Sequence, residues 1–178
     1  MIEDLQGEIR RRLQLCDSAT TNHHKGKAFE DLICFLFEAV PGITTRRNKK
    51  NVFETEEVDV FLWNEFFPGG LPSPAFPPWI LVECKNWSTK VDSMNINWFD
   101  HKLQSRGLSL GILIATQGIA GDPRRLTDAH LTIAQALPQG RRIIVITLED
   151  IECLASISDL VRLLKEKLSD LFLNMTCF

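Results

Sequence analysis

Three charged residues stand on two apolar stretches of this 178-residue sequence. Asp59 lies in EEVDVFLW, and Glu83 and Lys85 lie in WILVECK. Both stretches are rich in β-branched and aromatic residues, which predicts strands in which alternate side chains share a face. In each strand the charged residues therefore occupy the face opposite an apolar one that belongs to the core.

Two carboxylates on neighbouring strands are costly to bury together, because each disfavours ionisation of the other. A divalent cation removes this cost, and Mg²⁺ accepts hard oxygen ligands together with phosphate oxygens. We therefore predict Asp59 and Glu83 as metal ligands, with the backbone carbonyl of Cys84 as a third. Lys85 would project beside Glu83 and stabilise negative charge on a phosphate. The alternative is a structural Glu83–Lys85 ion pair with Asp59 as a surface acid, and the pairing of two strands favours the catalytic interpretation.

The elements around these strands are predicted from apolar spacing and turn residues. Helices are predicted at residues 2–16, 27–40, 94–106, 123–137 and 149–173. Strands are predicted at residues 43–50, 55–63, 79–85, 108–116 and 141–148. This order indicates an α/β sandwich in which helices flank a central mixed β-sheet.

The sequence shows no internal repeat and no linker, so a single domain over residues 1–178 is expected. Its parts are an N-terminal helix and loop at 1–22, a core at 26–153 and a C-terminal helix at 154–178. Hydrophobic residues make up 44% and charged residues 24% of the chain, as in folded soluble proteins. The net charge of −3 counts mildly against nucleic-acid binding without excluding it.

Cysteine usage and hydropathy indicate a cytoplasmic protein. The five cysteines are scattered, and none forms a CxxC pair, so reduced thiols are expected rather than disulfides or a zinc knuckle. No apolar run approaches the roughly 20 residues that span a bilayer, and the N-terminus lacks the plan of a signal peptide. No membrane association is therefore predicted.

With these motifs in place, the chain resembles the PD-(D/E)xK nuclease superfamily, and most closely its Mrr-like restriction-endonuclease branch. The resemblance covers about residues 26–153. The matching segments are GKAFEDLICFLFEAVPG, EEVDVFLWN, ILVECKNW, FDHKLQSRG, GILIATQGI and IIVITLEDI. One departure is Val58, which stands where the superfamily pattern has proline, as is common in the Mrr-like pattern. The resemblance implies a restriction-endonuclease-like three-layer sandwich.

The resemblance also implies roles for individual residues. Asp59 and Glu83 would be metal ligands, Lys85 the catalytic lysine, and Glu30 a further acid that reaches the site directly or through water. Gln104 is a polar residue on the helix that borders the site in this family, with a solvated helix face as the equally weighted alternative. The implied cofactor is Mg²⁺, with Mn²⁺ as a substitute, and the implied reaction is hydrolysis of a phosphodiester by in-line attack of water.

Double-stranded DNA is the substrate that the resemblance favours, in prokaryotic restriction or phage defence. The competing hypotheses are a non-cleaving module that binds nucleic acid or protein, and a junction resolvase or single-strand nuclease. A homodimer or a defence-system partner protein is a further candidate assembly. The basic cluster Arg46, Arg47, Lys49 and Lys50 is either a phosphate-binding surface or a solvated hairpin end, at even odds.

Overall fold

A mixed sheet forms the centre of the computed structural model, which describes residues 4–50 and 57–176. Its strands are β1 (Ile43–Lys50), β2 (Glu57–Asn64), β3 (Trp79–Lys85), β4 (Leu110–Ala115) and β5 (Arg142–Ile146). They lie in the sheet in chain order. The first three strands pair antiparallel, and β3, β4 and β5 pair parallel. The mixed sheet predicted from the sequence is confirmed.

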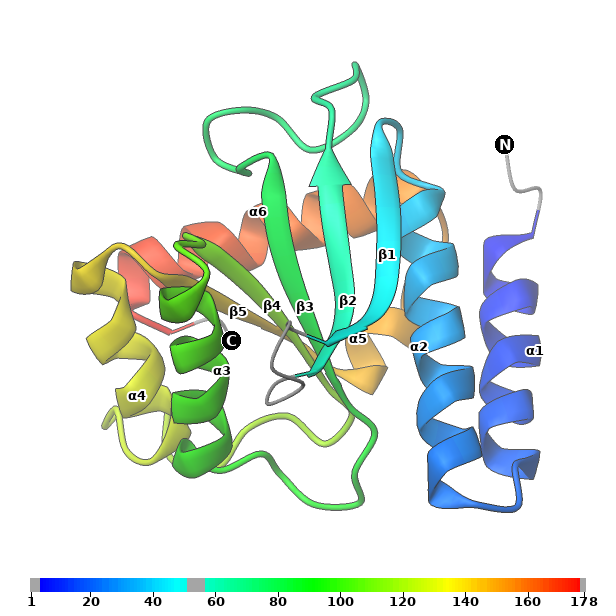
Figure 1. The fold of residues 1–178 in the computed structure, drawn as a ribbon, viewed down its shortest axis with the longest axis horizontal. Coiled ribbons are helices and arrows are strands. Elements are labelled where there is room, and N and C mark those ends of the chain that lie inside the picture. Colours follow the sequence, from blue (N-terminus) through cyan, green and yellow to red (C-terminus); the bar gives the residue numbers. More distant parts are fainter. Residues whose placement is uncertain (1–3, 51–56, 177–178) are drawn as a thin grey trace.

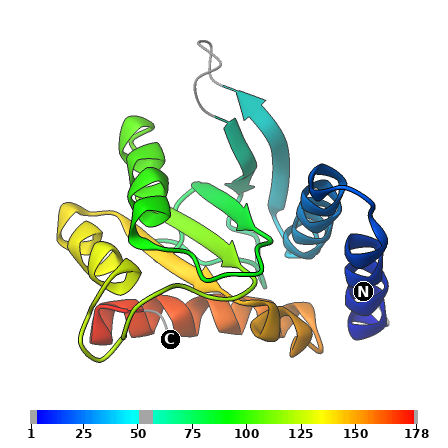
Figure 2. The same cartoon turned by 90° about the horizontal axis from the view of Figure 1, so that it is seen from below.

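Helices cover both faces of this sheet (Figure 1). The described α-helices are α1 (Leu5–Ser18), α2 (Asn22–Glu38), α3 (Ser93–Ser105), α4 (Ala129–Ala136), α5 (Leu148–Glu152) and α6 (Ile157–Asn174). Figure 2 shows α3 and α4 on one side of the sheet and α6 on the other, with α1 outside α2. The architecture is the predicted three-layer α/β sandwich.

The strand register separates an apolar face of β2 and β3 from the face that carries their charged residues. Val60 pairs with Val82 and Leu62 with Ile80, and all four side chains are fully buried. Because alternate residues of a strand face opposite sides, Asp59 and Glu83 lie on the other face, which is the face that α3 covers in part. The charged side chains of β2 and β3 thus lie on the face opposite these four core residues.

A close approach of α3 to the sheet depends on Gly111 in β4. A Cβ atom added there would lie 2.7 Å from Cζ of Phe99 and 2.9 Å from Cδ1 of Leu103. Only glycine leaves room for these two side chains of α3. A bidentate ion pair between Arg141 and Asp100, with N–O distances of 2.6 and 2.8 Å, also holds the helix in place.

Two helix starts differ from the sequence expectation. α2 begins at Asn22 rather than at residue 27, because the hydroxyl of Thr21 accepts the backbone N–H of His24 as a helix cap. The helix predicted from Pro123 begins only at Ala129, since Leu126 and Asp128 have φ angles of 49° and 53° and interrupt it. A short 3₁₀ helix, η1 (Leu137–Gln139), then follows α4.

The C-terminal region also differs from the prediction of one helix at 149–173. Two helices stand there, because Thr147 and Asp150 form a capping box for α5 and Ser156 caps α6. Within the described part of the chain, no helix is long and apolar enough to cross a membrane.

Candidate active site

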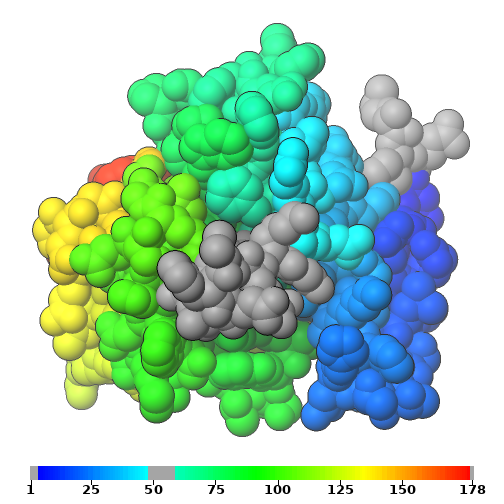
Figure 3. Space-filling model, viewed as in Figure 1, coloured from blue at the N-terminus to red at the C-terminus, as the bar shows by residue number. Residues whose placement is uncertain are grey.

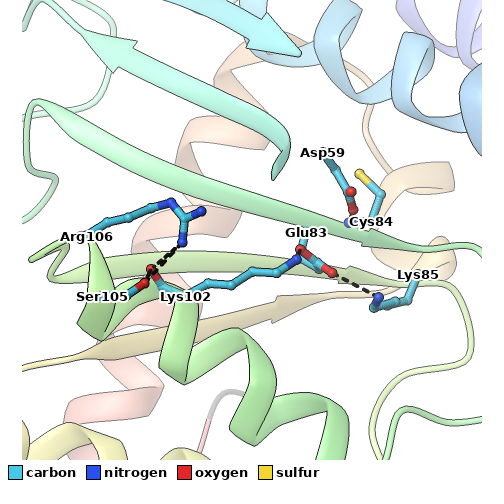
Figure 4. Close-up of polar contacts among 7 residues, drawn as sticks. All are labelled: Asp59, Glu83, Cys84, Lys85, Lys102, Ser105 and Arg106. Atoms are coloured by element: carbon cyan, nitrogen blue, oxygen red, sulfur yellow. Dashed lines mark hydrogen bonds and ion pairs between the residues drawn. The ribbon is translucent and has the colours of Figure 1, made fainter. Parts of the chain in front are cut away.

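Asp59 and Glu83 meet where the ladder between β2 and β3 ends. The last paired residues there are Val60 and Val82. Two residues beyond Val82, the backbone N–H of Cys84 donates to Oδ2 of Asp59 at 2.8 Å. The carboxylate of Asp59 therefore takes the place of a backbone acceptor, and this bond orients it toward β3 (Figure 4).

Glu83 accepts from two ammonium groups. Its Oε1 lies 2.9 Å from Nζ of Lys85, and its Oε2 lies 2.7 Å from Nζ of Lys102. The carboxylate is buried, so these charged partners compensate its desolvation. Figure 4 shows Lys85 approaching along β3 and Lys102 reaching in from α3. The ammonium of Lys85 also lies 5.0 Å from the ring centroid of Trp87, within cation–π range.

Burial and the charge of Glu83 raise the pKa of Asp59 to about 6 from its usual 3.8. The hydrogen bond from Cys84 and the charges of Lys102 and Lys85 act in the opposite direction and do not cancel the rise. The negative charge of Asp59 is therefore only partly compensated by the protein itself. This electrostatic deficit is what a bound cation would relieve.

The residues present fit a hard divalent cation. The N–H and C=O of one strand residue point to the same side, so the carbonyl of Cys84 faces the side of Asp59, beyond the end of the ladder. Two carboxylates and one carbonyl form the kind of oxygen set that Mg²⁺ accepts while keeping waters. Over residues 4–50 and 57–176, no group of three His, Cys, Asp or Glu side chains is arranged to hold a metal.

Glu30 lies on α2, one helical turn after Gly26 and half-buried. Burial raises the pKa of the Cys84 thiol, and the charges of Asp59 and Glu30 add to the rise. The helix thus brings this acid within electrostatic range of the site. A role for Glu30 as a further acid remains a prediction, and direct ligation beside both strand carboxylates is not seen among the described groups.

The helix beside the site contributes Lys102 to Glu83, whereas Gln104 is exposed. Two residues along a helix differ by about 200° in direction, so Gln104 faces away from the side that carries Lys102. Sequence reasoning missed Lys102, although it adjoins the buried residue Leu103. That adjacency is the signal that would have placed it near the sheet.

Other polar residues of α3 and the predicted basic cluster occupy separate surfaces. Asn97 and His101 lie beside the exposed Trp98 on the outer side of α3. Arg47 forms an ion pair with Asp31 of α2, whereas Arg46 is exposed on the other face of β1. The lysines of the basic cluster, Lys49 and Lys50, lie outside the residues whose side chains are described.

A polar cleft of about 690 Å³ adjoins the site at the ends of β3 and β4. Cys84 and Asn86, the neighbours of Lys85, line one wall, and Lys25 and Gly26 of α2 line the opposite wall. The cleft thus reaches the end of β3 at Cys84, while Asp59, Glu83 and Lys85 are not among its lining residues.

The fold and the paired acids with a lysine place the protein in the PD-(D/E)xK class of nucleases. In fold it is similar to the cAAA-bound form of NucC from P. aeruginosa ATCC27853, with a TM-score of 0.53 and 16% sequence identity over 80% of this chain and 72% of that chain. A family model described as Restriction endonuclease (Mrr_cat) matches residues 22–151, and the chain belongs to that family. No curated protein matches the sequence.

Family membership makes the chain a nuclease, a hydrolase whose substrate is a nucleic acid. It confirms the resemblance inferred from the motifs, and the match includes the strands of Asp59 and Glu83. The similarity to NucC, at its low identity, concerns the fold alone.

Proposed function

We propose that this protein is a metal-dependent DNA endonuclease whose site is formed by Asp59, Glu83, the carbonyl of Cys84 and Lys85. The observation that carries the proposal is the convergence of Asp59 and Glu83 at the end of the β2–β3 ladder. The raised pKa of Asp59 is the electrostatic consequence of this convergence and of burial. The family supports nuclease activity, and the fit of the oxygen ligands supports the divalent cation.

The chain's own groups have separable roles in this proposal. Asp59 and Glu83 hold the cation, which would be Mg²⁺ or, as a substitute, Mn²⁺. When bound, such a cation supplies Lewis-acid stabilisation of phosphate charge. The ammonium of Lys85 lies next to Glu83 and stabilises negative charge on the phosphate during attack by water. Glu30, from α2, adds a further negative charge near Cys84 that orients water.

The decisive experiment uses supercoiled plasmid, linear duplex, single-stranded DNA and RNA, each with Mg²⁺, Mn²⁺ or EDTA. We expect cleavage of DNA in the presence of the metals and none in EDTA. Lys85→Ala and Asp59→Asn should lower the cleavage rate at least 100-fold while the circular dichroism spectrum stays unchanged. Cleavage that survives both substitutions would contradict the assigned site.

Double-stranded DNA is the substrate that we propose first. The enzyme would act in restriction of foreign DNA or in defence against phage. It would be located in the cytoplasm, where that DNA enters. A homodimer would supply a second site for the second strand of a duplex. Tight DNA binding without cleavage under every metal would instead support a non-cleaving binding module.

A further inference from the structure

Three aromatic side chains form a continuous surface on the sheet face that carries the site. Phe61 stacks on Trp79 with ring centroids 5.6 Å apart and planes at 30°, and Trp79 contacts Trp63 at 4.5 Å. Trp63 is 42% exposed and Trp79 is 40% exposed. We call Phe61, Trp63 and Trp79 the aromatic surface.

This surface is uncovered, whereas α3 covers the same face of the sheet at β4. At Gly111 of β4 the face is covered by Phe99 and Leu103 of α3. In Figure 3, teal and green atoms of β2, β3 and the loop between them form the surface between α3 and β1. Single exposed apolar residues are ordinary in proteins, but two half-exposed indoles in mutual contact form a patch that a ligand would cover.

The register fixes how the aromatic surface lies relative to the site. Trp63 pairs with Trp79, and Asp59 lies four residues before Trp63 in β2, as Glu83 lies four residues after Trp79 in β3. At about 3.3 Å per residue this separation is roughly 13 Å. Stacked bases rise about 3.4 Å per nucleotide, so a strand with its phosphate at the site would bring about the fourth nucleotide onto the indoles.

A cation accompanies the aromatic rings. Arg46 of β1 pairs with Phe61 and lies on the same face of the sheet, where it is exposed. An arginine beside aromatic rings provides a phosphate contact and stacks on bases, the combination found where proteins hold single strands. The charge and the rings together match the chemistry of an unpaired nucleic-acid strand.

We propose that the aromatic surface binds unpaired bases of the DNA strand whose phosphate lies at the site, an inference that rests on the proposed endonuclease function. A paired base exposes its face only at the end of a duplex, whereas an unpaired base stacks on an indole and is held without sequence readout. The enzyme therefore favours duplex DNA that is gapped or splayed beside the cut, so that bases of the cleaved strand are unpaired there.

Binding is measured by fluorescence anisotropy in EDTA, with a 5′-fluorescein 12-nucleotide single strand and a blunt hairpin duplex as probes. The double variant Trp63→Thr/Trp79→Thr retains β-branched residues in both strands. We expect it to weaken binding of the single strand by roughly 5- to 150-fold, the effect of losing one stacked base. Duplex binding should change less than twofold.

Trp98→Thr is the matched control, because Trp98 is 61% exposed but lies on α3, outside the aromatic surface. It should leave single-strand affinity unchanged, and Trp79→Phe should keep it within about threefold. Thermal unfolding verifies that each variant is folded. If the double variant does not fold, single-strand affinity is compared between Trp79→Phe, which keeps an aromatic ring, and Trp79→Thr, which removes it.

Three outcomes would overturn the inference: unchanged single-strand affinity in the double variant, an equal loss for single strand and duplex, or a change of oligomeric state with unchanged affinity. The last would make the surface an interface between copies of the chain. A wild-type protein that binds the single strand through the indoles but cuts no DNA with any metal contradicts the proposed function and leaves the binding surface supported.

Discussion

Glu83 is held by ammonium groups from two different elements, Lys85 of its own strand and Lys102 of α3. Because both oxygens of the carboxylate are engaged, a divalent cation has to share or displace these partners. Lys102 is further from Glu83 in the sequence than Lys85 is. Unlike Lys85, it has no proposed role at the phosphate. Its ion pair is therefore the one expected to give way when a cation binds.

Replacing Lys102 tests this competition. In Lys102→Met the apolar stem is retained and the charge is lost, so the site becomes more negative and we expect the dissociation constant for Mg²⁺ to fall about tenfold, or ~1.4 kcal/mol. Isothermal titration calorimetry measures the change. Lys165→Met, at an exposed position of α6, is the control. A weaker affinity for Mg²⁺ in Lys102→Met would show that this lysine supports the ligands instead of competing.

The pKa of Asp59 predicts how stability depends on pH without metal. A folded pKa of about 6 against an ordinary 3.8 means that the folded state holds the proton more tightly. The free energy of unfolding in EDTA should therefore fall as the pH rises from about 4 to about 6, by at most about 3 kcal/mol. Asp59→Asn should remove this contribution to the pH dependence of the free energy of unfolding. The variant should therefore be more stable than wild type at pH 7.

Urea unfolding at several pH values between 4 and 7 measures both proteins. Only the difference between them isolates Asp59, because other carboxyl groups titrate in the same range. Parallel pH profiles of the two proteins would contradict a raised pKa at this residue. In excess Mg²⁺ the wild-type profile should reverse, since the cation competes with the proton for the carboxylate.

At the scale of elements, the position of Lys102 depends on how closely α3 packs on β4. Gly111 permits that packing, and Phe99 and Leu103 fill the space. Gly111→Ala should cost about 1–3 kcal/mol of stability, because the added methyl forces the helix outward. The same shift should separate Lys102 from Glu83 and reproduce the Mg²⁺ affinity of Lys102→Met. Urea denaturation and calorimetry measure the two effects.

Gly26→Ala is the matched glycine substitution. Gly26 lies inside α2, and a Cβ atom there meets nothing within 4 Å. Alanine should stabilise the helix by up to about 1 kcal/mol. Because Gly26 lines the polar cleft beside the site, a fall in cleavage rate with raised stability would indicate that substrate occupies the cleft. An equal loss of stability at both glycines would contradict the packing role of Gly111.

The sequence predicts the strands better than the contacts between elements. The alternation around Asp59 and Glu83 gave the correct strands and the correct shared face, because a period of two is a local property. Lys102 could not be assigned in this way, since its contact depends on the approach of α3 over Gly111. The false helix start at Pro123 has a similar cause: the left-handed backbone of Leu126 is invisible in a pattern of apolar spacing.

The number of sites that act together determines how the enzyme cuts both strands of a duplex. A duplex has two strands, and one chain brings one pair of carboxylates to the end of β3. If two copies act together, the rate of double-strand cleavage should rise with the square of protein concentration below the dissociation constant of the dimer. Nicking of plasmid followed by independent second cuts, at a rate linear in protein, would indicate a monomer.

The order of strands in the sheet is the order of the chain, and Asp59, Glu83, Lys85 and Lys102 leave the ribosome within one continuous stretch. The helix that packs behind β5, α6, is synthesised after all of them. Until α6 packs against the sheet, this helix does not bury the apolar face of β5 that carries Ile144 and Ile146. A nascent chain that stops before residue 157 should therefore aggregate although it contains every proposed ligand, and late docking of α6 would keep an unfinished enzyme from acting on the cell's own genome.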